Sequence, residues 1–262
     1  MDRQHVTRWM WVWGGVMMVW VSGCATPSPS PTEVASEAPK ETTALHTAQP
    51  KAPHWGYEGM DGPQRWGELT QAFATCSMGM QQSPIDLADV RSAEPEALRF
   101  EYTPTNLDIV NNGHTIQVNY DNGSDIVVGD ELYRLRQFHF HHPSEHTING
   151  KHYPMEIHFV HVNSEGNFAV VALLVEEGDE NMEFTSTWQH LPERAGDANH
   201  FGSITIDASK VLPTNRHYDA YAGSLTTPPC TEGVRWFVMT EPIQMSTAQI
   251  KHCDAIVPHN NR

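Results

Sequence analysis

Three observations predict a mainly β (α+β) fold for residues 54–262. Runs of alternating apolar and polar residues recur along this stretch, and a period of two is typical of half-buried strands. Two such runs flank Asn112-Gly113 and another follows Asn122-Gly123, dipeptides that favour hairpin turns. Helical periodicity is confined to two short segments. The full length of 262 residues fits one large domain or two small ones, with a substantial buried core.

The predicted strands are short runs of alternating or apolar residues bounded by turn residues. They comprise residues 107–110, 115–120, 125–128, 133–141, 155–162, 168–175 and 234–239. No internal repeat interrupts them, so we expect a single architecture to use them all.

Two helices are predicted. The first, residues 179–191, stops before Pro192. Its apolar face consists of Phe184, Trp188 and Leu191. The second begins at Ser246, where Gln249 completes a capping box. Its apolar face consists of Ile250, Cys253 and Val257.

The N-terminal residues 1–23 have the features of an export signal. Two arginines in residues 1–8 precede an apolar run over residues 9–21, which is too short for the roughly 20 residues that span a bilayer. Val21-Ser22-Gly23-Cys24 resembles a bacterial lipobox, which predicts that Cys24 carries the lipid anchor. A plain signal peptide, or an uncleaved anchor with an incidental cysteine, is the alternative. We expect export to the periplasmic or cell-surface side of a bacterial membrane.

Residues 24–53 are rich in Pro, Ser, Thr, Ala and Glu and have no apolar period, which predicts a disordered tether. The whole chain has a formal net charge of −16 and a pI near 5.3. This acidity argues against nucleic-acid binding through a basic patch and leaves the lipid anchor as the predicted contact with the membrane.

Residues 137–158 carry the most specific pattern in the chain. A strand sends successive side chains to opposite faces, so Gln137, His139 and His141 share one face. Phe138 and Phe140 share the other face and can pack into a core.

The strand at residues 155–162 alternates in the same way, with Glu156, His158 and Val160 on one face and Ile157 and Phe159 on the other. If the two strands are neighbours, three imidazoles converge, and three neutral imidazoles with one open position form a catalytic zinc site. Gln137 and Glu156 can each accept the second ring N–H of a ligating histidine. The remaining histidines of the region are interpreted as surface or packed residues: His142, His146, His152 and His161.

The chain resembles the α-class carbonic anhydrases in five separate motifs: HWGYEG, NNGH, QFHFHHPSEH, PMEIHFVH and GSLTTPPCTEGVRW. The resemblance runs from about Trp55 to the last residue. It implies a large, twisted, mostly antiparallel central sheet with short peripheral helices. It also implies zinc-dependent, reversible hydration of carbon dioxide to bicarbonate and a proton.

By this resemblance, His139, His141 and His158 hold Zn²⁺, and the Thr226 hydroxyl lies over the metal and donates to the carboxylate of Glu145. A hydroxyl has one proton, so Thr226 can only accept from the species at the metal. This orients a zinc-bound hydroxide for attack on carbon dioxide.

The resemblance also assigns the surroundings. His114 is the proton shuttle, since a histidine titrates near neutral pH. Tyr57, Asn112 and Gln117 order the connecting waters. The substrate pocket is formed by Val160, Val170, Leu225, Thr227, Val234 and Trp236. Judged on the residues alone, this wall would be ordinary core and His114 a surface histidine beside a turn.

An exported chain can form disulfides, and the resemblance pairs Cys76 with Cys230. Cys253 lies on the apolar helix face and is interpreted as a small buried hydrophobe, with a free thiol that mispairs as the alternative. Relatives continue beyond Asn260-Asn261-Arg262, so the domain at residues 54–262 is expected to be C-terminally shortened, with an uncovered sheet edge.

The alternative function is a catalytically silent carbonic anhydrase-like module that stores zinc or acts as an adhesin. The presence of Thr226, Glu145 and His114 favours the enzyme, because a zinc store needs none of them. The sequence makes no prediction of the oligomeric state.

Overall fold

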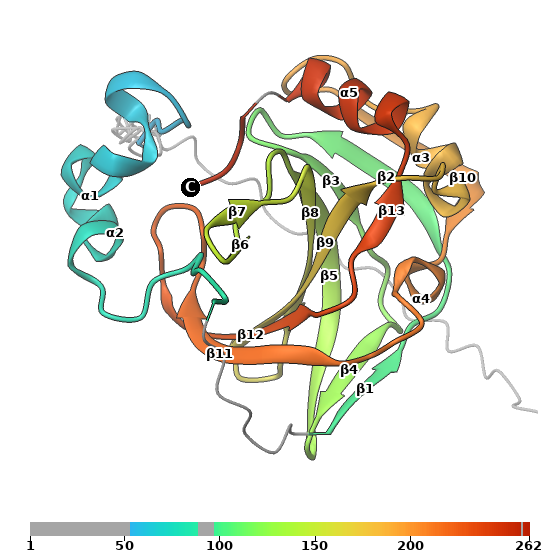
Figure 1. Cartoon of the computed structure of the whole chain (residues 1–262), viewed down its shortest axis with the longest axis horizontal. Coiled ribbons are helices and arrows are strands. Elements are labelled where there is room, and N and C mark those ends of the chain that lie inside the picture. The colour runs from blue at the N-terminus through green and yellow to red at the C-terminus, as the bar shows by residue number, and fades with distance from the viewer. Residues whose placement is uncertain (1–52, 89–96, 258) are drawn as a thin grey trace, which may run out of the picture. The chain divides into compact units, whose positions relative to one another are not determined.

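The computed structural model describes residues 53–88, 97–257 and 259–262. Within these residues, eleven strands form one large sheet and two form a small one (Figure 1). The strands are β1 (Leu98–Glu101), β2 (Thr105–Asn111), β3 (Ile116–Asn119), β4 (Asp125–Val128), β5 (Glu131–His141), β6 (Thr147–Ile148), β7 (Lys151–His152), β8 (Met155–Val162), β9 (Phe168–Glu177), β10 (Ala198–Ile206), β11 (Tyr218–Ser224), β12 (Glu232–Met239) and β13 (Ile243–Met245).

The main path of the large sheet runs β10-β2-β3-β5-β8-β9-β12-β11. Its pairings are antiparallel except that β12 and β13 each run parallel to β9. The expected mainly β fold with a large, mostly antiparallel sheet is therefore confirmed. All seven predicted strands are present within a few residues of the expected bounds.

Strands β10 and β11, which the sequence does not predict, form the two ends of the main path. An edge strand has one unpaired side and more exposed residues, so its apolar pattern is weaker. Strand β10 alternates between exposed and half-buried residues and has a register shift between Phe201 and Thr205. The short strands β1, β6, β7 and β13 also fall outside the prediction.

The helices are short, as predicted. They comprise η1 (Gly59–Asp61), η2 (Pro63–Arg65), α1 (Trp66–Leu69), η3 (Gln71–Phe73), α2 (Thr75–Met78), η4 (Met182–Phe184), α3 (Thr185–Trp188), α4 (Ala208–Val211) and α5 (Thr247–Ile256). Within the described ranges, no helix is long and apolar enough to cross a bilayer.

The predicted helix over residues 179–191 is wrong in its extent. Only η4 and α3 are helical there, because residues 179–181 are held in a non-helical arrangement: the backbone N–H of Asn181 donates to the side chain of Gln249 at 2.9 Å. The predicted apolar positions are nevertheless buried. The helix that begins after Ser246 is confirmed as α5, and its reciprocal capping box between Ser246 and Gln249 is present.

The two faces of the central strands β5 and β8 have different coverings. On one face, here called the helix face, Phe138, Phe140, Ile157 and Phe159 belong to a large core that includes residues of α3, α4 and α5. The opposite face, here called the ligand face, carries Gln137, His139, His141, Glu156 and His158. Beside it lies a second apolar cluster built on β9 and β12.

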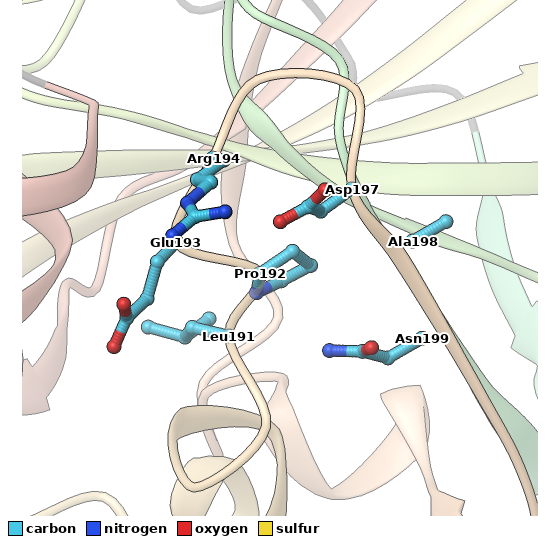
Figure 2. A pocket seen from close by; sticks show the side chains of 7 residues that line it. All are labelled: Leu191, Pro192, Glu193, Arg194, Asp197, Ala198 and Asn199. Atoms are coloured by element: carbon cyan, nitrogen blue, oxygen red, sulfur yellow. The ribbon is translucent and has the colours of Figure 1, made fainter.

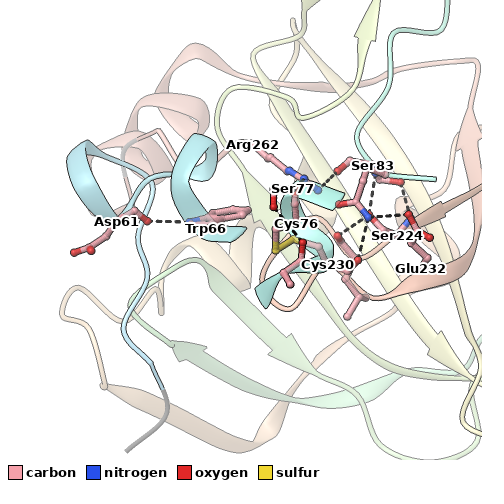
Figure 3. The surroundings of a disulfide bond; sticks show 12 residues. Asp61, Trp66, Cys76, Ser77, Ser83, Ser224, Cys230, Glu232 and Arg262 are labelled. Atoms are coloured by element: carbon pink, nitrogen blue, oxygen red, sulfur yellow. Dashed lines mark hydrogen bonds between the residues drawn. A yellow bond between two sulfur atoms is a disulfide. The ribbon is translucent and has the colours of Figure 1, made fainter. Parts of the chain in front are cut away.

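A third cluster joins the N-terminal helical segment to the loop before β12 (Figure 3). Cys76 and Cys230 form the predicted disulfide, with their Cα atoms 5.0 Å apart. The guanidinium of Arg262 donates to the carbonyl of Cys76 at 2.9 Å and lies over the ring of Trp66 at 5.9 Å. Cys253 is a buried free thiol on α5, as expected, and burial raises its pKa to about 12.

Candidate metal centre

The register between β5 and β8 brings the predicted histidines together. His139 lies opposite His158, and His141 lies opposite Glu156. Directly opposed residues of an antiparallel pair project from the same face, so all four side chains meet on the ligand face. Strand alternation and the register between β5 and β8 together gather the predicted triad.

Two of the three rings are oriented by the residues that the sequence predicts. Nδ1 of His139 pairs with Oε1 of Gln137 at 2.8 Å. Nε2 of His158 pairs with Oε1 of Glu156 at 2.8 Å. Because each acceptor fixes the tautomer of its ring, Nε2 of His139 and Nδ1 of His158 are left as lone-pair donors.

The third ring is oriented by a main-chain group that the sequence analysis misses. Nδ1 of His141 donates to the backbone carbonyl of Asn260 at 2.8 Å. Nε2 of His141 is buried and has no hydrogen-bond partner among the described residues. The ligand atoms of His139, His141 and His158 lie within 4.8 Å of one another. A buried, unpaired imidazole nitrogen in such a group fits a metal ligand, and the donor set suits zinc.

The protonation of the triad also suits a metal. Burial lowers the pKa of His141 to about 4. Burial likewise lowers the pKa values of His158 and, further, of His139, which is also repelled by its neighbours His141 and His158. All three imidazoles are therefore neutral at pH 7, the form that coordinates a metal.

Glu156 is the centre of a buried network that includes His146. Its Oε1 accepts from Nδ1 of His146 at 2.6 Å and from His158, while its Oε2 accepts from the backbone N–H groups of Glu145 and His146, each at 2.8 Å. Burial alone would raise the pKa of Glu156, but attraction to His146 and His158 holds it well below the usual range. Although His146, Glu156 and His158 could also group around an ion, these hydrogen bonds already engage both carboxylate oxygens.

The network continues through residues that the sequence does not single out. Nε2 of His146 lies 2.6 Å from the hydroxyl of Tyr221, which lies 2.8 Å from Oγ of Ser83. Oγ of Ser83 accepts from the backbone N–H of Ser224 at 3.1 Å. His146 is thus a packed histidine, as interpreted, but it connects the orienting residue of His158 to the strand that leads into Thr226.

Glu145 and Thr226 meet as predicted. The Thr226 hydroxyl is hydrogen-bonded to the carboxylate of Glu145, and Oε1 of Glu145 also accepts from the backbone N–H of Arg262 at 3.1 Å. Oε2 of Glu145 lies 3.5 Å from Nε2 of His141 and 3.8 Å from Nδ1 of His158. Burial raises the pKa of Glu145 to about 7, while His158 and Thr226 oppose the rise. A cation at the triad would lower the pKa of Glu145, because it stabilises the carboxylate.

His114 lies at the rim of the site, half-buried, with its ring stacked on Trp55 at a centroid distance of 3.7 Å and an interplanar angle of 7°. Burial, followed by repulsion from His54, lowers the pKa of His114 from its ordinary value. His114, Trp55 and Tyr57 line a cavity of about 430 Å³ that also borders Asn260.

The predicted water-network residues lie near these groups. Gln117 pairs in register with His139, and its Oε1 accepts from Nδ2 of Asn112 at 3.4 Å. The ring of Tyr57 makes an edge contact with that of His114 at 6.4 Å. Burial, together with the nearby Glu145, raises the pKa of Tyr57 well above its usual value, so its hydroxyl keeps its proton.

The predicted substrate wall belongs to the apolar cluster beside the ligand face. Its members are Val160, Val170, Leu225, Val234 and Trp236. Thr227 is half-buried outside this cluster, and its carbonyl accepts from the backbone N–H of Cys230 at 2.9 Å. The predicted anchor, Cys24, lies outside the described residues.

Another pocket, of about 390 Å³, lies where the segment after α3 enters β10 (Figure 2). It is lined by Leu191, Pro192, Glu193, Arg194, Asp197, Ala198 and Asn199. None of the predicted site residues lines it, so the ligand face remains the candidate centre.

The fold and the site together define a mainly β protein with a cluster of three histidines that could hold a metal ion. The sequence profile of the eukaryotic-type carbonic anhydrases matches residues 61–262. The chain therefore belongs to this family, the α-class carbonic anhydrases, and it is an enzyme of the carbonic anhydrase class, as are bacterial relatives at 40–44% identity.

Individual relatives agree with this assignment. A carbonic anhydrase from Nostoc sp. is 43% identical over 220 residues, which cover 82% of this chain and 83% of the relative. One from Neisseria gonorrhoeae is 44% identical over 211 residues, covering 80% and 83%. The α-carbonic anhydrase of Thermovibrio ammonificans, solved with the inhibitor sulfanilamide, superposes with a TM-score of 0.78 at 45% identity and covers 80% of this chain and 94% of that chain.

Proposed function

We propose that the protein catalyses the reversible hydration of carbon dioxide to bicarbonate and a proton at a zinc ion held by His139, His141 and His158, with His114 as the proton carrier. The observation that carries the proposal is the triad itself. Each ring has one nitrogen fixed by a hydrogen bond, and the three rings each offer one ligand nitrogen within 4.8 Å of the other two.

Zinc held by three imidazoles supplies a nucleophile at neutral pH, because it lowers the pKa of its bound water to about 7, a value known from carbonic anhydrase itself. The chain contributes neutral rings whose orientation is set before the metal binds. The outer ring nitrogens of His158 and His139 donate to Glu156 and Gln137, and these hydrogen bonds increase the basicity of the two imidazoles.

Thr226 controls which species can occupy the centre. Its single proton is used toward Glu145, so its oxygen can only accept from a group in the site. A species that contacts Thr226 must therefore donate a proton of its own to the threonine oxygen. A lone pair of that species is then free to face the apolar wall. Val170 and Trp236, both almost fully buried, belong to the wall against which carbon dioxide would rest.

His114 is suited to carry the proton away. Its lowered pKa keeps the ring neutral at pH 7, where it can accept a proton and release it to solvent. Stacking on Trp55 places the ring at the rim of the cavity that includes Tyr57.

The test is a pH-indicator assay of carbon dioxide hydration with and without a zinc chelator. Activity should require zinc. His114→Ala should lower kcat with little change in kcat/KM, and imidazole-type buffers should restore the rate because they replace the missing base. Thr226→Ala should lower kcat/KM without rescue by buffer. A zinc-loaded protein that is inactive would instead support a silent zinc-binding module.

We further propose that the protein is exported and held by lipid at Cys24 on a bacterial membrane, with residues 24–53 as a tether. Support comes from the Val21 to Cys24 motif and from the disulfide between Cys76 and Cys230, which suits an oxidising compartment. Cys24→Ser should release the protein from the membrane fraction or block its processing. A processed variant that remains with the membrane would contradict the proposal.

A further inference from the structure

Asn260 contacts two elements. One is β5, here called the triad strand, which carries His139 and His141, and the other is the turn between β2 and β3, residues 112–115, here called the His114 loop. Asn260 is 1% exposed. Its backbone N–H donates to the carbonyl of His142 at 3.0 Å, and its backbone carbonyl accepts from His141 at 2.8 Å. The side chain makes three more bonds. Oδ1 accepts from the backbone N–H of His142 at 2.7 Å, while Nδ2 donates to the carbonyls of His114 at 3.0 Å and Phe140 at 2.8 Å.

The two bonds from Nδ2 connect elements far apart in the sequence. Phe140 lies between two residues of the triad on β5, and His114 lies in the turn between β2 and β3. The carbonyl of Phe140 also accepts from Oγ1 of Thr115 at 2.5 Å. One carbonyl of the triad strand therefore receives donors from the His114 loop and from Asn260, and Asn260 closes the arrangement by its bond to His114.

The rest of the His114 loop is held from within. Oδ1 of Asn112 accepts from the backbone N–H groups of His114 and Thr115, both at 2.9 Å, and Gly113 adopts a φ of +87°. These bonds define the shape of the turn but do not connect it to β5. The ring of His114 stacks on Trp55, while the main chain of His114 is held by the bond from Asn260 to its carbonyl.

We infer that Asn260 is a positioning residue for proton transfer: beside the two hydrogen bonds between Thr115 and Phe140, its side-chain amide fixes the carbonyl of His114 itself to the strand that bears His139 and His141. The inference rests on the proposed function, in which His114 carries the proton. The side chain holds the main chain of the His114 loop and of the triad strand, whereas the backbone carbonyl of the same residue accepts from the ring of His141 itself. Substitution of the side chain can therefore separate the two roles.

Asn260→Ala is the informative variant, because it removes the amide and keeps the backbone carbonyl that orients His141. Asn261→Ala is the matched control in the same segment, since Nδ2 of Asn261 makes one bond of 3.4 Å to the carbonyl of Ser144. Asn260→Asp serves if the alanine variant fails to fold: it keeps an acceptor for the N–H of His142 and lacks the two donors.

For Asn260→Ala we expect one zinc per chain by elemental analysis and nearly unchanged kcat/KM. In dilute buffer kcat should fall roughly 10-fold, less than the 10²- to 10⁴-fold typical of losing a general acid or base. Concentrated imidazole buffer should restore kcat. Deuterium uptake of residues 113–116 should be faster than in wild type, and Asn261→Ala should match wild type in every measurement.

A double variant completes the test. If Asn260 acts through His114, adding Asn260→Ala to His114→Ala should not lower kcat further. Additive losses, lost zinc, or a parallel fall in kcat/KM would overturn the inference and place the effect at the metal ligand. If Asn260→Ala keeps full kcat while His114→Ala is impaired, the positioning role of Asn260 is refuted and the shuttle role of His114 stands. Full kcat in His114→Ala would refute the proposed shuttle and this inference with it.

Discussion

The two faces of β5 and β8 differ in chemistry more than in burial, although Gln137 and His139 on the ligand face are only half-buried. On the helix face, Phe138, Ile157 and Phe159 have no exposed surface. On the ligand face, Glu156 is also fully buried and His158 is 1% exposed. The apolar side chains gain stability from burial, at about 1.5–3 kcal/mol each. The polar ones lose hydration and must recover it through hydrogen bonds.

The comparison shows how one pair of strands can supply both stability and a site. The four donors around Glu156 compensate for its burial, and fixed partners leave one unused nitrogen on each ring of the triad. Because alternation separates the faces, a substitution on one face should leave the property of the other largely intact. The following predictions test this separation, beginning with the largest expected effect.

His158→Ala removes one ligand from the ligand face. We expect zinc content to fall from one per chain to near zero and hydration to approach the uncatalysed rate, since two imidazoles do not form the site. The thermal transition of the metal-free variant should remain cooperative because the helix face is untouched. Elemental analysis and calorimetry check both points. Tight zinc binding in His158→Ala would show that the triad is wrong.

Phe138→Ala makes the opposite change, on the helix face between Gln137 and His139. The ring packs against Phe140 and Phe159 in the large core, so its loss should destabilise the fold by ~3–5 kcal/mol. Urea unfolding measures this loss. Below the transition, zinc stoichiometry and kcat/KM should stay near wild type. A selective loss of zinc at full stability would contradict the separation of the faces.

Glu156→Gln tests the bonds that compensate for polar burial. It replaces a carboxylate that accepts four N–H donors with an amide that has one acceptor oxygen, so zinc affinity should fall roughly 10- to 100-fold. Gln137→Ala should cost less, because Gln137 is half-buried and its oxygen supports one ring. Competition with a chromophoric chelator ranks the two variants. A larger loss of zinc affinity in Gln137→Ala than in Glu156→Gln would mean that the burial of an orienting residue does not determine its contribution to zinc affinity.

The smallest predicted effect concerns His161, a histidine on the helix face. Its Nε2 lies 2.8 Å from the hydroxyl of Tyr102, and burial lowers its pKa to about 3. Between this value and 6.5 the unfolded chain binds a proton that the folded one does not, so stability is complete above pH 6.5 and falls as the pH drops toward 3. One such group changes stability by up to about 1.4 kcal/mol per pH unit in that window.

Urea midpoints at pH 6.0 and 5.0 measure this slope. His161→Gln cannot titrate there and should have a shallower slope than wild type, with zinc affinity at pH 7.5 unchanged. Equal slopes in both proteins would assign the acid sensitivity to other groups.

The local patterns of the sequence were sufficient to predict the ligand face. Alternation in residues 137–141 and 155–159 assigns every side chain there to the correct face, because the period of a strand depends only on neighbouring residues. The same reasoning predicts Gln137 and Glu156 as orienting residues. For Thr226 and His114, the residues alone favoured a loop and a turn, and the family resemblance supplied the roles.

Long-range partners could not be predicted in this way. Asn260 orients His141 through its backbone carbonyl, a group that every residue has, so no side-chain pattern marks it. The sequence analysis interprets His146 as a surface or packed histidine because it lies outside the pattern of the two strands. Its partner Tyr221 lies 75 positions further along, where no local pattern marks it. The predicted extent of the helix at residues 179–191 is wrong for a similar reason. Before η4, the backbone N–H of Asn181 donates to Gln249, a residue 68 positions away that the local pattern does not reveal.

The contact between His141 and Asn260 spans 119 positions, and this bears on the order of folding. Strands β5 and β8 are near neighbours in sequence and can pair early, whereas the third ring acquires its orientation only after a long loop has closed. A nascent chain thus has its three imidazoles well before it has a finished centre. We expect high-affinity zinc uptake during refolding to lag behind sheet formation, as followed by circular dichroism. Simultaneous phases would show that two oriented rings suffice to capture the metal.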